Sequence, residues 1–261
     1  MTLWSVFTKP WAHLDPDTLG ELVAGLGFDG AEVPVRDTAY VTPAEAEQRL
    51  PGFAKTMREH GVDVISIAAD LSESTFAAAQ AAEVPVIRIM APLRDDDYRT
   101  AVDRIRRELE AAVPLTERYG VGVGVQPHHG RFVTSALGVW HLVEGLPDAF
   151  TVVWDAAHDA LAGDDPRVTL PLVAERLSIV NLKNAVYVPA DSGGWRSWFV
   201  QGIEGLSDWP AVFESLDQLA FTGPICLTGQ YSDPSASVED RLRVDLAAAR
   251  QAAATRTVTY R

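Results

Sequence analysis

Apolar residues recur along the chain in two alternating patterns, one typical of buried strands and the other of amphipathic helices. Short apolar runs bounded by turn residues predict strands at residues 4–8, 30–35, 62–68, 84–90, 121–126, 151–155, 178–182 and 224–228. Helical spacing of apolar residues predicts helices between them, at 15–26, 43–60, 72–82, 97–119, 135–144, 165–177, 208–220 and 235–253. Repeated strand–helix units are typical of a parallel sheet. We therefore predict an α/β protein with one domain over residues 1–261, a single (β/α)8 TIM barrel.

Two stretches depart from this regular pattern. Pro114 lies inside the predicted helix 97–119, and we expect it to kink or split that helix because proline removes a backbone donor. Residues 183–207 have little helical periodicity and contain Gly193, Gly194 and three large aromatic residues. A long loop in a compact domain is usually functional, so we predict a lid over the barrel mouth. Trp195 in this lid either packs it down or stacks on a bound ligand.

The alternation of side chains along a strand predicts which residues face the barrel interior. In 121–126 the valines share one face, which leaves Gln126 at the mouth above two glycines that open space. Asp155 shares its face with Val153. The same parity brings further polar side chains to the mouth: Asn181, Lys183, Thr228 and Gln230.

Glu32 and Arg88 are predicted to form an ion pair inside the barrel. Both lie at inward positions of strands that are otherwise apolar. An unpaired charge in such a place costs several kcal/mol, so the arginine needs a partner. The pair is either a fixed structural element or a clamp for an anionic part of the substrate.

The charge of the chain restricts its partners. With 22 Lys and Arg against 36 Asp and Glu, the formal net charge is −14. Binding to nucleic acid or to an anionic membrane requires clustered basic residues, so we expect neither partner. A small anion such as a phosphorylated metabolite remains compatible with local basic residues.

The cellular compartment is predicted from targeting signals and from the cysteine content. No apolar run is long enough to span a membrane, and the first residues lack the basic and apolar regions of a signal peptide. Cys226 is the single cysteine, which fits a reducing cytoplasm. The expected location is therefore cytoplasmic.

Motifs at the strand ends resemble a known family. They are Phe28-Asp29-Gly30-Ala31-Glu32, Gln126-Pro127-His128, Asp155-x-x-His158, Asn181-Leu182-Lys183-Asn184 and Gly223-Pro224-Ile225-Cys226-Leu227. In this order and spacing the chain resembles the xylose isomerase-like TIM barrels, which include sugar isomerases, ketose 3-epimerases and inosose dehydratases. The resemblance spans nearly the whole chain and implies a (β/α)8 fold and action on a sugar. Members are often dimers or tetramers, so a homo-oligomer is also implied.

The resemblance implies a metal site that this chain has lost in part. Family members hold one divalent cation with Glu, Asp, His and Glu after the fifth to eighth strands. The matching positions are Gln126, Asp155, Asn181, and either Gln230 or Thr228. Because hard cations favour carboxylate oxygens, we expect at most one weakly held Mn²⁺, Mg²⁺ or Zn²⁺. Amides are not bases near neutral pH, so the family's proton exchange between two glutamates is excluded.

Other side chains at the mouth can still perform chemistry. His158, beside Asp155, could act as a general acid or base, or Asp155 could cap a helix while His158 lies on the surface. His128, followed by His129, supplies a second imidazole across the barrel, and Lys183 could polarise a carbonyl or form a Schiff base. The expected catalytic residues are Asp155, His158, His128 and Lys183. The expected substrate-binding residues are Gln126, Asn181, Gln230, Glu32, Arg88 and Trp195.

The leading hypothesis is an isomerase- or epimerase-like enzyme that moves protons on a sugar or polyol, with or without phosphate. A first alternative is a catalytically degenerate barrel that only binds a sugar-like ligand. A second is a lyase or dehydratase that uses histidine as base. All three require a small-molecule, sugar-like partner.

Overall fold

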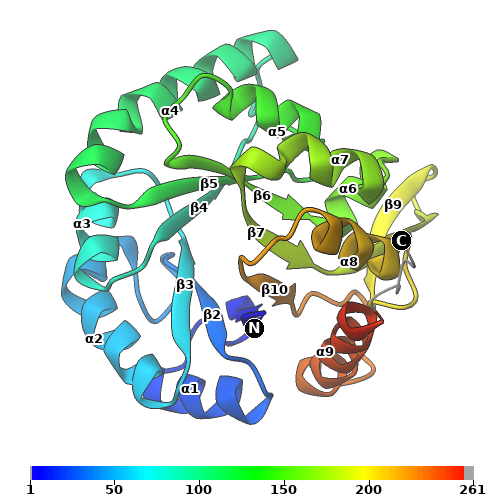
Figure 1. Cartoon of the computed structure of the whole chain (residues 1–261), viewed down its shortest axis with the longest axis horizontal. Coiled ribbons are helices and arrows are strands. Elements are labelled where there is room, and N and C mark those ends of the chain that lie inside the picture. Colours follow the sequence, from blue (N-terminus) through cyan, green and yellow to red (C-terminus); the bar gives the residue numbers. More distant parts are fainter. Residues whose placement is uncertain (1, 256–261) are drawn as a thin grey trace.

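The computed structural model describes residues 2–255 and contains a closed barrel of parallel strands (Figure 1). The strands follow one another around the barrel in the order β1-β10-β7-β6-β5-β4-β3-β2. The predicted (β/α)8 barrel is confirmed. Its strands are β1 (Trp4–Phe7), β2 (Gly30–Pro34), β3 (Asp63–Ala68), β4 (Val86–Met90), β5 (Gly122–Gln126), β6 (Phe150–Asp155), β7 (Leu177–Leu182) and β10 (Ile225–Thr228).

Helices surround the barrel and bury one face of each against the outer side of the strands (Figure 1). They are α1 (Pro16–Gly25), α2 (Ala46–Glu59), α3 (Glu73–Ala81), α4 (Tyr98–Tyr119), α5 (Ala136–Val143), α6 (Ala156–Ala162), α7 (Pro166–Val173), α8 (Trp209–Gln218) and α9 (Val238–Ala254), with 3-10 turns η1 (Lys9–Trp11), η2 (Pro43–Glu45) and η3 (Ala174–Arg176). Most α-helices begin after an Asp or Ser whose side chain accepts backbone N–H groups of the first turn, as Asp15 and Ser72 do.

Pro114 does not split α4, which excludes one of the two outcomes that we expected. The helix runs unbroken from Tyr98 to Tyr119 and ends at Gly120, whose φ of 65° is left-handed. One lost backbone hydrogen bond is small beside the burial of an apolar face that includes Ile105 and Leu109.

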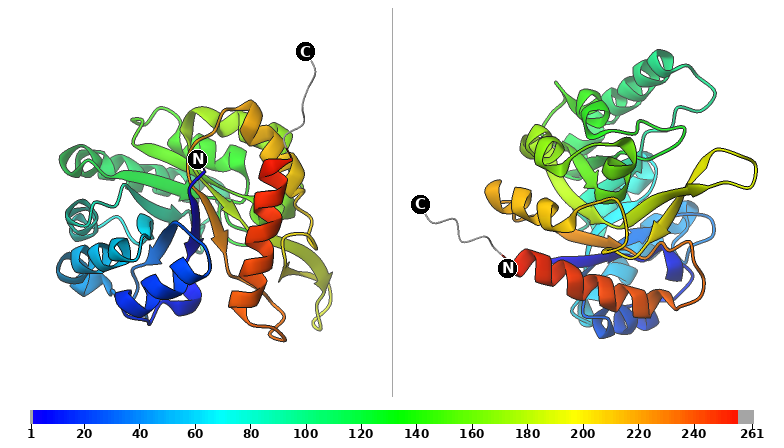
Figure 2. Two further views of the ribbon diagram at one scale, coloured as in Figure 1. Left: turned by 60° about the horizontal axis from the view of Figure 1, so that its bottom comes forward. Right: turned by 90° about the vertical axis from the view of Figure 1, so that its right-hand side faces the viewer.

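We expected residues 183–207 to form a long irregular loop, and this prediction is wrong. They contain an antiparallel hairpin of β8 (Asn184–Pro189) and β9 (Trp195–Val200), which projects beyond the barrel (Figure 2). Gly193 and Gly194 have φ of 84° and 78°, so the turn needs residues that tolerate this conformation. At its base the Asn184 amide donates to the carbonyls of Gly202 and Ser207, at 2.7 and 2.9 Å. The Asn184 oxygen accepts the Ser207 amide N–H, so this side chain holds both ends of the segment together.

The lower barrel interior is apolar, and the predicted parity of β5, β6, β7 and β10 is confirmed. The buried cluster consists of Phe7, Ile65, Ala68, Val153, Ile179 and Cys226. Gly124 does face inward, but it opens no space. A Cβ there would lie 2.7 Å from a methyl of Val153, so the glycine makes room for that side chain. Polar groups are therefore confined to the upper end, where the strands finish.

Candidate active site at the barrel mouth

Asp155 ends β6 and is the N-cap of α6, a helix that our expected ranges did not include. Its side chain is fully buried, and Oδ1 accepts the backbone N–H of His158 at 3.1 Å as an N-cap. Oδ2 accepts the Gln126 amide at 2.6 Å and lies 3.3 Å from the Lys183 ammonium. The capping interpretation is thus correct, and the same carboxylate also belongs to the polar cluster at the mouth.

Lys183 directly follows β7 and points into this cluster. Its Nζ lies 2.8 Å from His158 Nε2, and it sits 5.3 Å from the centre of the Phe199 ring. Burial lowers the pKa of Lys183, and the Asp155 carboxylate opposes that effect. His158 is also buried rather than on the surface. Asp155, Lys183 and His158 thus form one continuous chain of contacts.

Three histidines gather above this chain. His158 Nδ1 lies 3.3 Å from His129 Nδ1, and the ring centres of His128 and His158 are 4.2 Å apart. One ring nitrogen from each of the three lies within 4.8 Å of the others, so the cluster could hold a metal ion. Burial lowers the pKa of His158 and His129, and it lowers that of His128 to about 4. All three imidazoles are therefore neutral at pH 7.

The hairpin closes this part of the mouth. Ser197 Oγ lies 2.9 Å from His129 Nε2, and the Phe199 ring packs within 5.8 Å of the His129 ring, measured between centres. The expectation of a lid is met by Ser197 and Phe199, whereas Trp195 is 70% exposed near the hairpin turn. Sequence reasoning had singled out neither the role of His129 nor that of Ser197.

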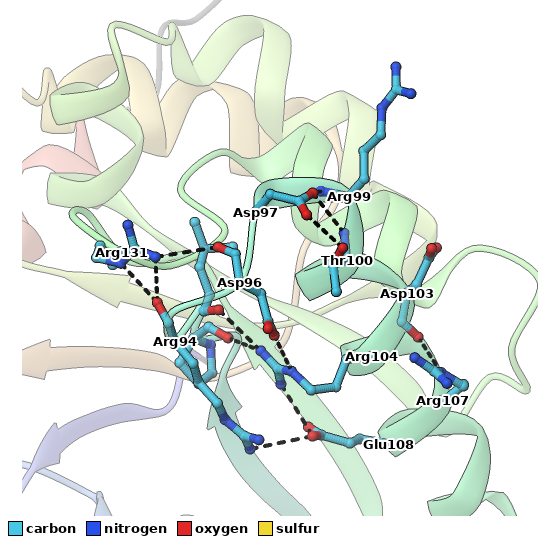
Figure 3. Close-up of polar contacts among 12 residues, drawn as sticks. Arg94, Asp96, Asp97, Arg99, Thr100, Asp103, Arg104, Arg107, Glu108 and Arg131 are labelled. Carbon is cyan, nitrogen blue, oxygen red and sulfur yellow. Dashed lines mark hydrogen bonds and ion pairs between the residues drawn. The ribbon is translucent and has the colours of Figure 1, made fainter.

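The loop that carries His128 and His129 is fixed to its neighbour (Figure 3). Arg131 in this loop donates through Nε to the Arg94 carbonyl at 2.8 Å. Arg104 of α4 donates to Asp96 at 2.9 Å and holds the same neighbouring loop from the other side. Because both loops are tied to the body of the barrel, the two imidazoles are held in place.

The four positions that the resemblance assigns to a metal do not fit a hard cation. Asp155 is their single carboxylate, and its Oδ2 already contacts the Lys183 ammonium. Asn181 is buried beside it, with an Oδ1 that has no hydrogen-bond partner within residues 2–255. Gln230 is partly buried and its side chain takes part in none of the hydrogen bonds of these residues. Neutral amides and an ammonium cannot replace the missing carboxylates.

Glu32 and Arg88 form the expected ion pair inside the barrel. Arg88 donates Nε to the carboxylate at 3.1 and 3.2 Å and Nη2 to Oε1, and both side chains are buried. Ser66 donates to Glu32 at 2.8 Å, and the guanidinium lies 4.8 Å from the centre of the Phe7 ring. These contacts match the structural interpretation of the pair.

A cavity of about 310 Å³ lies next to this pair, at the carboxyl ends of β2, β3 and β4. Arg36 lines it together with Arg88 and Met90. The Arg36 guanidinium takes part in none of the hydrogen bonds and ion pairs within residues 2–255. Its place directly after the predicted strand 30–35 was the sequence signal that could have revealed it.

Within the described residues, no helix has the length and hydropathy needed to cross a bilayer.

Comparisons with known proteins place the chain in a family. The model of the family described as xylose isomerase-like TIM barrel matches residues 21–252. No curated protein matches the sequence. Among solved structures, D-psicose 3-epimerase with D-tagatose from Clostridium cellulolyticum H10 has a TM-score of 0.76 and 12% identity, over 97% of this chain and 99% of that chain.

Two further structures have the same fold. The 3-keto-D-glucoside 4-epimerase from E. coli has a TM-score of 0.73 and 13% identity, over 96% of this chain and 100% of its own. The probable 3-DHS dehydratase involved in petrobactin synthesis from Bacillus anthracis has a TM-score of 0.71 and 15% identity, over 95% and 98%. At such identities the likeness concerns the fold alone. Because the family model covers most of the sequence, the chain belongs to the xylose isomerase-like TIM barrel family.

Proposed function

We propose that the protein is an isomerase- or epimerase-like enzyme that moves a proton next to a carbonyl of a sugar or polyol. One observation carries the proposal: Lys183 Nζ lies between Asp155 Oδ2, at 3.3 Å, and His158 Nε2, at 2.8 Å, at the end of the barrel where this fold places its sites. Buried, hydrogen-bonded groups of this kind are typical of acid–base catalysis.

In the proposed reaction Lys183 is the group that exchanges a proton with the substrate. Asp155 holds its Nζ in place, and His158 accepts or supplies the second hydrogen bond to it. Because burial lowers the pKa of Lys183, the free amine becomes accessible nearer to neutral pH than in an exposed lysine. His128 forms the adjacent wall.

Neighbouring amides support a sugar-like substrate. The buried Asn181 Oδ1 has no partner among residues 2–255, and an unpaired buried acceptor is costly unless a ligand donates to it. A sugar hydroxyl is such a donor. Gln126 and Gln230 add further amide groups at the mouth. Glu32 and Arg88 hold the neighbouring wall in place.

The proposed setting is the cytoplasm, which a single, buried cysteine suits. A homo-oligomer remains part of the proposal, because the family resemblance implies one.

Solvent isotope incorporation tests this function. The protein would be incubated in D₂O with D-fructose, D-tagatose and D-psicose, and carbon-bound deuterium would be followed by NMR. We expect incorporation that Lys183→Gln reduces at least about a hundredfold, since general acid–base groups contribute on that order. Lys55→Gln is the matched control, because Lys55 is exposed on α2.

Two results would favour the other hypotheses. If the sugars bind and no deuterium enters any of them, the protein is a binding barrel. If an unsaturated product forms with loss of water, the protein is a lyase. Incorporation that survives Lys183→Gln in a folded protein would overturn the role given to Lys183.

A further inference from the structure

The ring nitrogens of the three imidazoles at the mouth are spaced as the ligands of a zinc ion would be. In a tetrahedral zinc site each Zn–N bond is about 2.0–2.1 Å, which places two ligand nitrogens roughly 3.3–3.4 Å apart. His158 Nδ1 and His129 Nδ1 are 3.3 Å apart. The third ligand atom, from His128, completes a group whose members all lie within 4.8 Å of one another.

The outer nitrogen of each ring already has a partner. His128 Nδ1 lies 2.8 Å from the carbonyl oxygen of His129, and His129 Nε2 lies 2.9 Å from Ser197 Oγ. His158 Nε2 faces Lys183 Nζ. Metal-binding histidines usually donate their second ring N–H to a fixed acceptor, and the His129 carbonyl beside His128 and the Ser197 hydroxyl beside His129 are such acceptors. The remaining nitrogens are Nε2 of His128 and Nδ1 of His129 and His158; His158 Nδ1 also accepts the backbone N–H of His129 at 3.4 Å, a long contact that an ion would replace.

We propose that His128, His129 and His158 bind one zinc ion, at a place different from the four positions implied by the family resemblance. Three imidazoles suit zinc, whereas Mg²⁺ prefers oxygen ligands. With three protein ligands, zinc keeps a fourth position for water or a substrate oxygen.

The surroundings of the site match this assignment. Phe199 packs against the rings of His129 and His158, at 5.8 and 6.2 Å between centres, and shields the cluster from solvent. Lys183 stands on the Nε2 side of His158, so the imidazole ring separates its Nζ from the proposed ion. Use of the ion to polarise a substrate carbonyl rests on the proposed function; binding of the ion does not.

Calorimetry of the untagged protein, stripped with chelator, tests the site directly with Zn²⁺, Mn²⁺ and Mg²⁺. We expect one zinc per chain and no measurable Mg²⁺ binding. His129→Ala and His128→Ala should each weaken zinc binding by more than about a hundredfold, and Ser197→Ala by about ten- to a hundredfold. Both histidines are only partly buried, so these variants leave the barrel core untouched. Circular dichroism would verify their folding.

Two matched variants complete the design. His141→Ala removes an exposed histidine of α5 and should leave zinc binding unchanged. Gln230→Ala removes one of the positions implied by the family resemblance and should leave zinc affinity unchanged, because the Gln230 side chain takes part in none of the hydrogen bonds within residues 2–255. Cobalt substitution gives a second readout, since tetrahedral Co²⁺ absorbs visible light strongly.

Three results would overturn the site: no zinc binding below millimolar concentration, normal binding by both His129→Ala and His128→Ala, or loss of binding in Gln230→Ala alone. Failure of the proposed function looks different. Zinc would then bind as expected while no deuterium enters any of the sugars.

Discussion

Asp155 performs several tasks with one side chain. It caps α6 through Oδ1, while Oδ2 contacts both Gln126 and Lys183. A helix cap is worth about 1 kcal/mol, whereas an unpaired buried charge costs about 3–5 kcal/mol. The second task therefore determines most of what this residue contributes to stability.

Replacement of Asp155 by alanine is expected to lower the free energy of unfolding by about 3–5 kcal/mol, because Lys183 loses its carboxylate partner. Urea denaturation measures the change. Asp15→Ala is the control, since Asp15 caps α1 in the same way on an exposed surface. We expect about 1 kcal/mol there. Equal losses in the two variants would contradict this account of the buried cluster.

The ion pair of Glu32 and Arg88 allows a stricter test at the same scale. Glu32→Met alone leaves Arg88 buried without its partner, and we expect a loss of about 3–5 kcal/mol. The double variant Glu32→Met, Arg88→Met should recover most of that loss, because the unpaired charge is gone. Denaturation of the two single variants and the double variant completes the cycle. No recovery in the double variant would mean that the pair has a larger role than mutual neutralisation.

Among the elements, the hairpin of β8 and β9 is the one whose placement matters most for the site. Its base is held by the four hydrogen bonds of the Asn184 amide, to Gly202, Ser207 and Ala185. Its far strand brings Ser197 and Phe199 to the histidines.

Asn184→Ala should loosen the segment 184–207, since it leaves buried backbone groups without partners at a cost of about 1–3 kcal/mol each. Hydrogen–deuterium exchange by mass spectrometry would show faster exchange there. Asn181→Ala is the control, because the Asn181 oxygen makes no hydrogen bond within residues 2–255 and its loss should leave the hairpin protected. Unchanged exchange in Asn184→Ala would show that the strands alone fix the hairpin.

The loop after the hairpin is tied to α9 by a buried carboxylate whose ionisation affects stability. Asp245 accepts the Gly202 N–H at 2.9 Å and the Tyr231 hydroxyl at 2.8 Å. Burial raises the pKa of Asp245 above its ordinary value of 3.8, although these hydrogen bonds lower it. A raised folded pKa means that its contribution is present below the unfolded pKa and is lost as pH rises through the folded pKa.

We therefore expect the wild type to lose stability relative to Asp245→Asn as pH rises from 3.8 through the folded pKa of Asp245. Chemical denaturation of both proteins at a series of pH values measures the difference. Asp148→Asn, at a fully exposed position, is the control for the loss of one carboxylate. A constant gap between wild type and Asp245→Asn would mean that the carboxyl has the same pKa in both states.

For the whole molecule, the fold could be predicted because the strand–helix pattern is repeated around the barrel. A wrong prediction for one element, such as α6, therefore does not change the predicted fold. The parity of the strands also brought Gln126, Asp155, Asn181 and Lys183 to the mouth correctly. The site residues that could not be predicted from the sequence lie in the loops that follow the strands. His129 belongs to a loop positioned by backbone contacts to the loop after β4, such as that between Pro92 and Phe132, and parity does not extend there.

The hairpin was missed for a different reason. Both faces of β8 are partly exposed near its end, so the expected alternation of apolar and polar residues is weak. The β-branched and aromatic residues on either side of Gly193 and Gly194 were the usable signal. Helix α6 was missed because it is short and follows β6 without a connecting loop, so that Asp155 both ends the strand and caps the helix.

The Asn184 contacts also have a mechanical meaning. Lys183 and Asn184, the first residue of the hairpin, are neighbours in the chain. Without a restraint at Asn184, a movement of the hairpin would also displace Lys183. The hydrogen bonds of the Asn184 amide fix the chain at the first residue of the hairpin, directly after Lys183. Any bending of the hairpin would then be confined to the part beyond Asn184, and Lys183 would keep its place.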